Sequence, residues 1–255
     1  MSEQKLFPTE TIDLPSKGKL YPENSPLRSG KIELKFMTAK EEDILTSTNL
    51  IQKGIVLDRL FESLIVSKGV KPDDVLTGDL NAVMVAARIL GYGKDYNVKV
   101  TCNKCNTEQE IDFDLSDLGE SEGATDIKRN DNGEFELQLP ASKSIVTFKI
   151  LTRGDEKKMQ AEIEGMKKLN KDMGKDNTTF LRWIVTSVNG DTDKFKISTF
   201  VENLLVKDAK FLRQEYSRAM PNIDFEFDLI CESCSTSSKT RLPIGVNFFW
   251  PDSAV

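Results

Sequence analysis

The chain has 255 residues, a formal net charge of −6 and a sequence pI near 5.0. This acidic balance argues against binding of nucleic acid by bulk charge. No apolar run approaches the ~20 residues that span a bilayer. Because the chain contains no histidine, Ser-His-Asp catalysis, Cys-His catalysis and histidine-ligated metal sites are excluded. With 38% hydrophobic residues, the composition is that of a globular protein with its own core.

Residues 1–30 predict an extended N-terminal arm. Prolines at positions 8, 15, 22 and 26 exclude a long helix in this segment. Apolar residues are spread through it, which makes it less polar than a disordered tail. We expect the arm to dock on its own fold or on a partner.

A strand followed by a helix is predicted twice. Residues 32–36 alternate apolar and polar side chains, and Thr38 with Glu41 forms the capping-box signature of a helix start. Residues 146–150 alternate in the same way, and the following Thr152 can cap a second helix. The two segments therefore predict the same strand-to-helix unit.

The parallel between the two segments continues at an offset of 121 residues. The apolar pattern predicts a helix that ends near Gly69 and a counterpart that ends near Gly190. A further helix is expected from Leu76, and its counterpart from Ile197 through Phe211. We therefore expect an α+β fold with two internally duplicated halves. Each half would contain a strand, then about three helices, then a strand that leads into a cysteine pair.

The predicted organisation has five parts along the chain. They are the arm at 1–30, a first half at 31–115, an acidic Gly-rich linker at 116–133, a second half at 134–245 and an aromatic C-terminal tail at 246–255. Residues 135–139 are expected to form a hairpin with 145–150. The tail contains Phe248, Phe249 and Trp250, and it should either fold back into the core or anchor in a partner.

The four cysteines form two Cys-x-x-Cys pairs, Cys102/Cys105 and Cys231/Cys234, whose equivalent residues lie 129 positions apart. Each pair follows an alternating strand and precedes polar turn residues and a second strand-like run. A Cys-x-x-Cys turn presents two sulfurs to one point, and a tetrahedral zinc takes four thiolates. The chain shows no export signal at its start, so we expect a reducing compartment, where such pairs hold metal rather than disulfides. The sequence thus predicts one structural zinc per chain, in a four-cysteine ribbon that joins the halves.

Other chemistries are less well supported. The cysteines could be unmetallated thiol pairs, or a thioredoxin-like redox site, although neither pair opens a helix after a strand. A catalytic zinc is disfavoured because four thiolates fill its coordination sphere. No P-loop, no G-x-G-x-x-G after a strand and no G-x-S-x-G motif is present. None of the 41 acidic residues stands out as part of a catalytic pair. We therefore predict a protein that is not an enzyme, with a carboxylate-based enzyme as a minor alternative.

Three segments carry a resemblance to a known family. They are LPSKGKLYP in the arm, GKIEL with the following MTAKEEDIL, and the VKVTCNKC knuckle, which is joined by a second knuckle near the end. Over residues 8–245 the chain resembles baseplate proteins of contractile-tailed bacteriophages of the T-even type, the small hub or hub-assembly proteins. The resemblance implies a non-enzymatic part in building the centre of the tail baseplate. It also implies that Cys102, Cys105, Cys231 and Cys234 are zinc ligands.

The resulting hypothesis is a structural or assembly component of a phage tail baseplate, in its hub region, that acts through protein–protein contacts. Its partners would be other baseplate and tail proteins, with self-association as a homo-oligomer left open and no role for a membrane. It would be found in the virion tail, or in the host cytoplasm during assembly. The alternative is a zinc-ribbon module that binds nucleic acid or a polymerase. That alternative needs a basic face, which the net charge of −6 disfavours.

Overall fold

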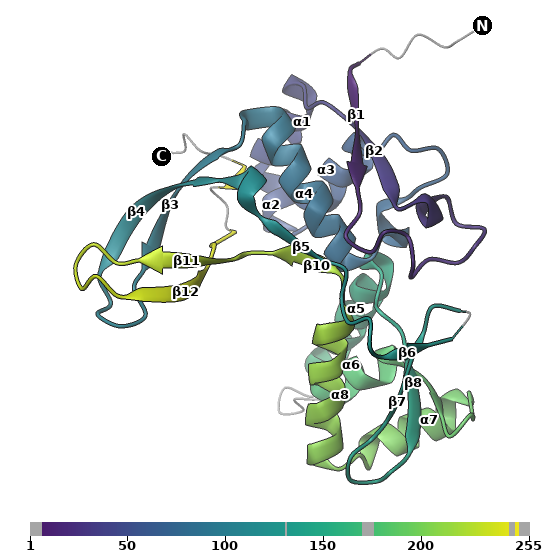
Figure 1. The fold of residues 1–255 in the computed structure, drawn as a ribbon. Coiled ribbons are helices and arrows are strands. Elements are labelled where there is room, and N and C mark those ends of the chain that lie inside the picture. The colour runs from purple at the N-terminus through teal and green to yellow at the C-terminus, as the bar shows by residue number, and fades with distance from the viewer. Residues whose placement is uncertain (1–6, 131, 170–175, 245–247, 250–255) are drawn as a thin grey trace, which may run out of the picture.

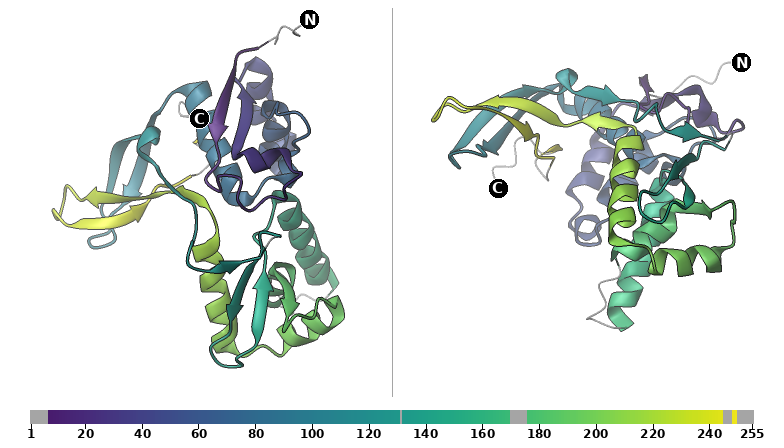
Figure 2. Two further views of the ribbon diagram at one scale, coloured as in Figure 1. Left: turned by 45° about the vertical axis from the view of Figure 1, so that its right-hand side comes forward. Right: turned by 60° about the horizontal axis from the view of Figure 1, so that its bottom comes forward.

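Figure 1 shows a computed structural model of the chain, which describes residues 7–130, 132–169, 176–244 and 248–249. Helices and antiparallel strands are both present, so the fold is α+β as predicted. The chain forms an upper lobe and a lower lobe, and two long hairpins project to one side. Both views in Figure 2 show these hairpins side by side and pointing away from the helical lobes.

The upper lobe is a two-stranded sheet covered by helices. Its elements are β1 (Thr9–Asp13), η1 (Pro26–Ser29), β2 (Lys31–Lys35), α1 (Ala39–Thr46), α2 (Thr48–Gln52), α3 (Val56–Leu64), η2 (Pro72–Asp74) and α4 (Thr77–Tyr92). Ile32 and Leu34 alternate with polar residues along β2 and are buried in the core. α1 begins at the predicted capping box, where the Thr38 N–H donates to the Glu41 carboxylate at 2.9 Å.

The segment predicted as an extended arm packs on its own fold over residues 7–30. β1 pairs antiparallel with β2 along all five of its residues. The connection between them buries Leu14 and Leu27. The many prolines therefore shape an ordered loop rather than a free extension. Residues 1–6 lie outside the described residues.

The lower lobe has a larger sheet. Its elements are β6 (Lys128–Arg129), β7 (Phe135–Gln138), β8 (Ile145–Phe148), α5 (Arg153–Leu169), α6 (Asp176–Ile184), β9 (Val185–Val188), α7 (Lys194–Glu202) and α8 (Val206–Ala219). The strand order is β6-β7-β8-β9, and every neighbouring pair is antiparallel. The predicted hairpin is confirmed as β7 paired with β8.

One helix prediction in the lower lobe is wrong. The helix expected from Ile197 through Phe211 is divided, because α7 ends at Glu202 and α8 begins at Val206. Leu205 is the N-cap of α8 and has extended backbone angles, with φ −60° and ψ 139°. Both helices bury apolar residues in one core, so the apolar period continues across the break and does not reveal it.

A strand was also missed. The helix expected to end near Gly190 stops earlier, and Val185–Val188 forms β9 at the edge of the sheet. β9 pairs with β8, with Phe148 opposite Val185. Its sequence Val-Thr-Ser-Val is rich in β-branched residues, which favour strands. Only Asn189 and Gly190, which both have positive φ, form the turn.

The remaining strands belong to the crossing between lobes and to the hairpins. They are β3 (Asp95–Thr101), β4 (Glu108–Asp114), β5 (Gly119–Ser121), β10 (Asn222–Asp224), β11 (Glu226–Ile230) and β12 (Ser237–Arg241), with a short η3 (Leu115–Asp117). The segment predicted as a linker contains β5, which pairs with β10. Further along, the Ala124 N–H donates to the Arg218 carbonyl at 2.9 Å, and Ile127 is buried. This segment is therefore held along the end of α8.

The lobes meet where α4 begins and where β8 leads into α5, a contact called here the lobe joint. Leu76 and Thr152 form an isolated antiparallel bridge. The Arg153 N–H donates to the Val75 carbonyl at 2.9 Å. The Thr77 N–H donates to the Leu151 carbonyl at 3.4 Å. The joint is thus made by backbone hydrogen bonds between two short extended segments.

Ion pairs and apolar packing support the lobe joint. Arg153 and Lys157 lie 3.0 and 3.3 Å from the Asp58 carboxylate. Lys157 also lies 2.6 Å from Asp73. A single hydrophobic cluster includes buried residues of both lobes, so the lobes share one core.

The aromatic residues described near the C-terminus fold back onto the base of the first hairpin. Phe248 is fully buried and packs edge-on against Tyr96, with ring centroids 5.4 Å apart. Phe249 packs against Phe248 at 5.2 Å. The Tyr96 hydroxyl donates to the Pro243 carbonyl at 2.9 Å. Of the predicted tail, Trp250 lies outside the described residues.

Candidate metal centre

Each cysteine pair lies in the turn of a projecting hairpin. The first turn joins β3 to β4, with Thr101 opposite Glu108. The second joins β11 to β12, with Ile230 opposite Ser237. Because each turn is long and polar, it can fold around its two sulfurs without disturbing the strand register.

The two turns have the same backbone hydrogen bonds. In the first, the Cys102 N–H donates to the Thr107 carbonyl at 2.9 Å, and the Asn106 N–H donates to the Cys102 carbonyl at 3.0 Å. In the second, the Cys231 N–H donates to Thr236 at 3.1 Å, and the Ser235 N–H donates back to Cys231 at 2.8 Å. These are two copies of one knuckle.

A left-handed residue closes each knuckle. Asn106 has φ 56° and Ser235 has φ 54°. Asparagine tolerates this region better than most residues, and serine carries only a small side chain. The left-handed step turns the chain back after the second cysteine, which lets both sulfurs of a pair face the other hairpin.

The four sulfurs form one cluster. All four Sγ atoms lie within 4.8 Å of one another. Across the hairpins, Cys102 Sγ lies 3.8 Å from Cys234 Sγ, and Cys105 Sγ lies 3.6 Å from Cys231 Sγ. Sulfurs at ~2.3 Å from a tetrahedral zinc ion would be ~3.8 Å apart. The cluster therefore has the size of a zinc–sulfur tetrahedron, and its members are free thiols rather than disulfides.

The sulfurs differ in exposure and in their hydrogen bonds. Cys102 and Cys231 are buried, Cys234 is half-buried and Cys105 is exposed. The Thr107 side chain and backbone lower the pKa of Cys105 to about 6. The equivalent Thr236 likewise lowers the pKa of Cys234. Thiolates rather than thiols bind metals, so the knuckles favour the ligand form of both second cysteines.

Contacts between the hairpins hold the cluster together. Gln109 donates from Nε2 to the Ile230 carbonyl at 3.3 Å and accepts the Glu232 N–H at 3.1 Å. Asn103 Nδ2 donates to the Lys239 carbonyl at 3.2 Å. Sequence reasoning missed Gln109, because a single polar residue on a strand carries no signal of a partner more than 120 residues away.

Aromatic packing supports the base of the hairpins. The rings of Phe113 and Phe227 lie 5.3 Å apart. Phe225 is buried at the start of the second hairpin. These contacts place the two hairpins face to face, so packing outside the cluster helps to bring the sulfurs together.

The ligand set limits the chemistry of the site. All four predicted ligands, Cys102, Cys105, Cys231 and Cys234, converge on one point. Four thiolates satisfy a zinc ion fully and leave no position for water or substrate, which is the pattern of structural rather than catalytic zinc. The described residues contain no second cluster of three or more potential ligands.

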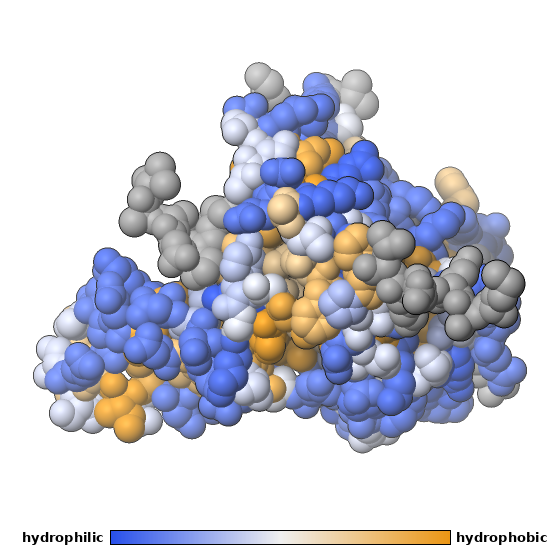
Figure 3. Space-filling model, turned by 90° about the horizontal axis from the view of Figure 1, so that it is seen from above, coloured by the Kyte–Doolittle hydropathy of each residue, from blue (hydrophilic) through white to orange (hydrophobic). Residues whose placement is uncertain are grey.

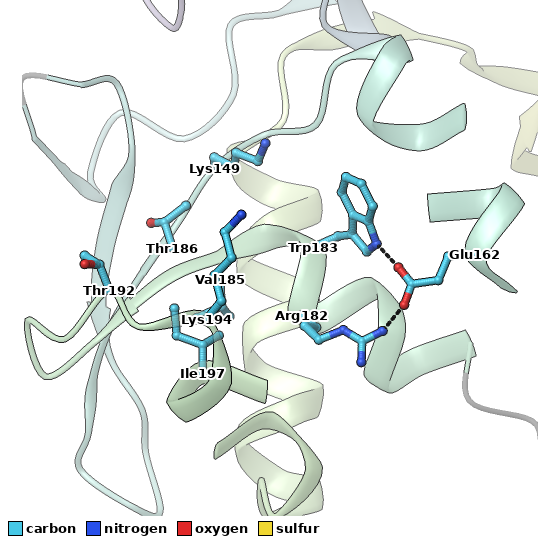
Figure 4. A pocket seen from close by; sticks show the side chains of 9 residues that line it. All are labelled: Lys149, Glu162, Arg182, Trp183, Val185, Thr186, Thr192, Lys194 and Ile197. Carbon is cyan, nitrogen blue, oxygen red and sulfur yellow. Dashed lines mark hydrogen bonds and ion pairs between the residues drawn. The ribbon is translucent and has the colours of Figure 1, made fainter. Parts of the chain in front are cut away.

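A separate pocket of about 450 Å³ lies in the lower lobe (Figure 4). Its lining comprises Lys149, Glu162, Arg182, Trp183, Val185, Thr186, Thr192, Lys194 and Ile197. Glu162 accepts hydrogen bonds from Arg182 and from the Trp183 indole N–H, the latter at 2.8 Å. Because its only carboxylate is engaged by these two side chains, the pocket presents no free acid–base pair.

The fold is of the α+β class, and two of its hairpins bring four thiols into one cluster that could hold a metal ion. A family model described as T4 bacteriophage base plate protein matches residues 8–250 of the chain. The chain therefore belongs to this family of phage baseplate proteins. No match was found among curated proteins or among solved structures. Within the described residues, no helix is both long and apolar enough to cross a membrane.

Proposed function

We propose that the chain is a structural component of the hub region of a contractile phage tail baseplate, where it acts through protein–protein contacts. The observation that carries this proposal is the family match, which extends over residues 8–250. Nucleic-acid binding is not favoured, because the family is one of baseplate proteins and the net charge is −6.

We propose further that one zinc ion occupies the cysteine cluster. The sulfur spacings of 3.6 and 3.8 Å across the hairpins support a tetrahedral ion. Cys102, Cys105, Cys231 and Cys234 would be its ligands. Since two ligands come from each hairpin, the ion would tie together segments that are far apart in the chain.

The two halves are proposed to be copies of one unit. From Leu76 to Phe113 the upper half matches the lower half at a constant spacing of 129 residues. The helix N-caps Leu76 and Leu205 have nearly equal angles, with φ/ψ of −61°/142° and −60°/139°. The counterpart of α4 is thus α8, which replaces the match at Ile197 suggested by an offset of 121 residues.

The sheets support the same relationship. Ile12 lies opposite Ile32 in the upper hairpin, as Leu137 lies opposite Val146 in the lower one. Leu34 forms a bridge with Ile65 in the upper lobe. In the lower lobe the equivalent Phe148 pairs with the first residue of β9.

A buried carboxylate occurs at the same place in each half. Asp79 on α4 accepts the Ser16 N–H at 2.9 Å, and Asp208 on α8 accepts the Ala141 N–H at 2.7 Å. Both donors follow a Leu-Pro pair in the loop between the first two strands of their half. Both carboxylates are fully buried. A shared polar contact of this kind is more specific than the likeness of two amphipathic helices, so it supports duplication strongly.

The proposal is tested by metal analysis and by copurification. The purified chain should contain one zinc per molecule and should copurify with other tail proteins of its phage. Cys231→Ser should lose the metal, whereas Ser233→Ala, an exposed non-ligand position in the same knuckle, should keep it. A wild-type chain that purifies without zinc and whose four thiols all titrate freely would contradict the zinc proposal. A chain that binds no tail protein would contradict the baseplate role.

A further inference from the structure

The lobe joint uses one surface from each half. The upper lobe contributes the start of α4, and the lower lobe contributes the turn from β8 into α5. Each half also contains a surface that corresponds to the one contributed to the joint by the other half. In the lower lobe this is the start of α8, and in the upper lobe it is the turn from β2 into α1.

The start of α8 has the backbone of the start of α4 but is uncovered. Just before α8, the Leu204 N–H donates to the Val201 carbonyl at 3.2 Å. Just before α4, the Val75 N–H donates to the Pro72 carbonyl at the same distance of 3.2 Å. Leu76, which forms a backbone bridge with Thr152 of the lower lobe, is only 4% exposed. At the counterpart positions, Leu205 is 54% exposed and Val206 is 82% exposed.

The turn from β2 into α1 reproduces the turn from β8 into α5. The Thr38 carbonyl accepts the Glu42 N–H at 3.2 Å, and the Thr152 carbonyl accepts the Glu156 N–H at 3.0 Å. A lysine–carboxylate pair of 2.7 Å stands beside each turn. Figure 3 looks onto the end of the molecule where β2 leads into α1, and hydrophobic residues gather in the middle of that face.

Among the described residues, Ala39 and Lys40 at the β2–α1 turn are exposed. The two surfaces lie at opposite ends of the molecule. In Figure 1, α1 begins at the upper end and α8 begins at the lower end, with the lobe joint between them. A contact between two different surfaces of this kind joins copies head to tail rather than as a symmetric pair.

We propose that copies of this chain associate head to tail, with the start of α8 of one copy on the β2–α1 turn of the next. The correspondence between the halves predicts two hydrogen bonds between copies. The Ala39 N–H would donate to the Leu204 carbonyl of the neighbouring copy, and that copy's Val206 N–H would donate to the Met37 carbonyl. Neither N–H has a hydrogen-bond partner among the described residues. Burial of Leu205 and Val206 would supply apolar contact area.

The contact between copies should be weaker than the lobe joint, because the ion pairs of the joint are not repeated. Ala39 and Asp43 stand at the positions of Arg153 and Lys157. Glu202 stands at the position of Asp73, so it would face Asp43 without a cation between them. Lys40 also replaces Gly154, which lies so close to Asp73 that a Cβ would meet its carbonyl oxygen at 2.9 Å.

Charge reversal at Asp43 gives the sharpest test. Asp43→Lys would place a lysine opposite Glu202, as Lys157 stands opposite Asp73 at 2.6 Å in the joint. Sedimentation velocity of the purified full chain, over a wide range of concentration, should show wild-type self-association that Asp43→Lys strengthens several-fold. Val206→Lys should abolish association in both backgrounds. Phe195→Lys, at an 81% exposed position outside the contact, should change nothing.

A mixing experiment tests the head-to-tail arrangement. Ala39→Pro removes the donor N–H while keeping the helix start, because proline is well tolerated at the first helical position. Ala39→Pro and Val206→Lys should each be monomeric, and an equimolar mixture should form pairs, because each variant keeps the surface that the other has lost. Circular dichroism of each variant checks its folding.

The proposal would be overturned if both the wild-type protein and the Asp43→Lys variant sedimented as monomers. Association that Val206→Lys leaves unchanged, or a mixture of the two blocked variants that stays monomeric, would overturn it as well. The inference rests on the correspondence of the halves proposed above and not on the baseplate role. Copurification with tail proteins can therefore succeed or fail independently of this result.

Discussion

At the scale of single residues, buried carboxylates organise both lobes. Glu41 is completely buried and accepts hydrogen bonds from Lys35 at 2.7 Å, Ser63 at 2.5 Å and the Thr38 hydroxyl at 2.7 Å. Burial disfavours its charge, but these donors outweigh burial and lower the pKa of Glu41 to about 2. The carboxylate therefore joins the end of β2, the start of α1 and the end of α3.

Replacing Glu41 should change how stability depends on pH. The folded pKa lies below the ordinary value of 4.5, so the charged form stabilises the fold at neutral pH. This stability should disappear as the pH falls from about 4.5 to about 2. Glu41→Gln should lower the free energy of unfolding by about 3 kcal/mol at pH 7, since it leaves a largely buried Lys35 unpaired. Urea unfolding across this pH range measures the difference, which should narrow toward low pH.

A matched variant isolates the effect of burial. Glu62 forms an exposed pair with Arg59, so Glu62→Gln should cost less than about 1 kcal/mol at any pH. Equal losses for the two variants would refute the assigned role of Glu41.

Asp79 and Asp208, which are both buried, show how local donors decide ionisation. Burial raises the pKa of Asp79 in spite of hydrogen bonds from Ser16 and Tyr21. Burial opposes ionisation of Asp208 as well, but the backbone N–H groups of Ala141 and Ser142 lower its pKa. The two buried aspartates therefore differ in how easily they ionise, because their hydrogen-bond donors differ.

At the scale of elements, close backbone contact sets how α4 fits against the hairpin base. A Cβ on Gly78, in the first turn of α4, would lie 1.6 Å from the Pro221 carbonyl oxygen. Any larger residue must push α4 away from the segment that leads into β10. The contact explains why a glycine is needed at a helix position where glycine is otherwise unfavourable.

Two Gly→Ala variants in helices should have opposite effects. Gly78→Ala should destabilise the protein by about 3 kcal/mol, the upper end for overpacking. Gly165→Ala, in α5, has no neighbouring atom within 4 Å of the new Cβ, so it should stabilise the protein by roughly 0.5–1 kcal/mol through helix propensity. Thermal unfolding of both variants compares them directly. Similar melting temperatures would show that the backbone contact at Gly78 is not tight.

At the scale of the whole molecule, the cysteine cluster joins hairpins that leave opposite lobes. The first hairpin follows α4 of the upper lobe, and the second follows α8 of the lower lobe. Side chains such as Gln109 and Phe113 already bring the hairpins together. A metal at the cluster would therefore lock an arrangement that the rest of the fold prepares.

Removal of the metal should loosen the hairpins before the lobes. Chelation should accelerate hydrogen exchange in β3, β4, β11 and β12 by at least about tenfold. The reason is that the free energy of metal binding stabilises the folded form of the knuckles that these strands carry. Exchange in α4 and α8 should change little, since both helices belong to the shared core. Uniform acceleration throughout the chain would instead indicate that the metal supports the whole fold, and unchanged exchange would contradict a bound metal.

Local patterns made several features predictable. The helix starts at Thr38 and Thr152 depend on residues three positions away, and each cysteine pair is a four-residue motif. Strand alternation before each pair placed the hairpins. The break before Val206 and the strand β9 were missed, because apolar periodicity reports burial and does not distinguish one buried element from two.

By itself, the sequence determined the α+β class and the two knuckles with their four cysteines, because these depend on short-range spacing and side-chain chemistry. Only the tertiary structure decided that α4 and α8 begin with nearly the same backbone angles, that Asp79 and Asp208 each hold a loop between two strands, and that Leu76 meets Thr152 at the lobe joint. These contacts join residues that lie 63 to 76 positions apart. The free energy of a long-range contact depends on where the rest of the chain places both partners, and no local pattern contains that information.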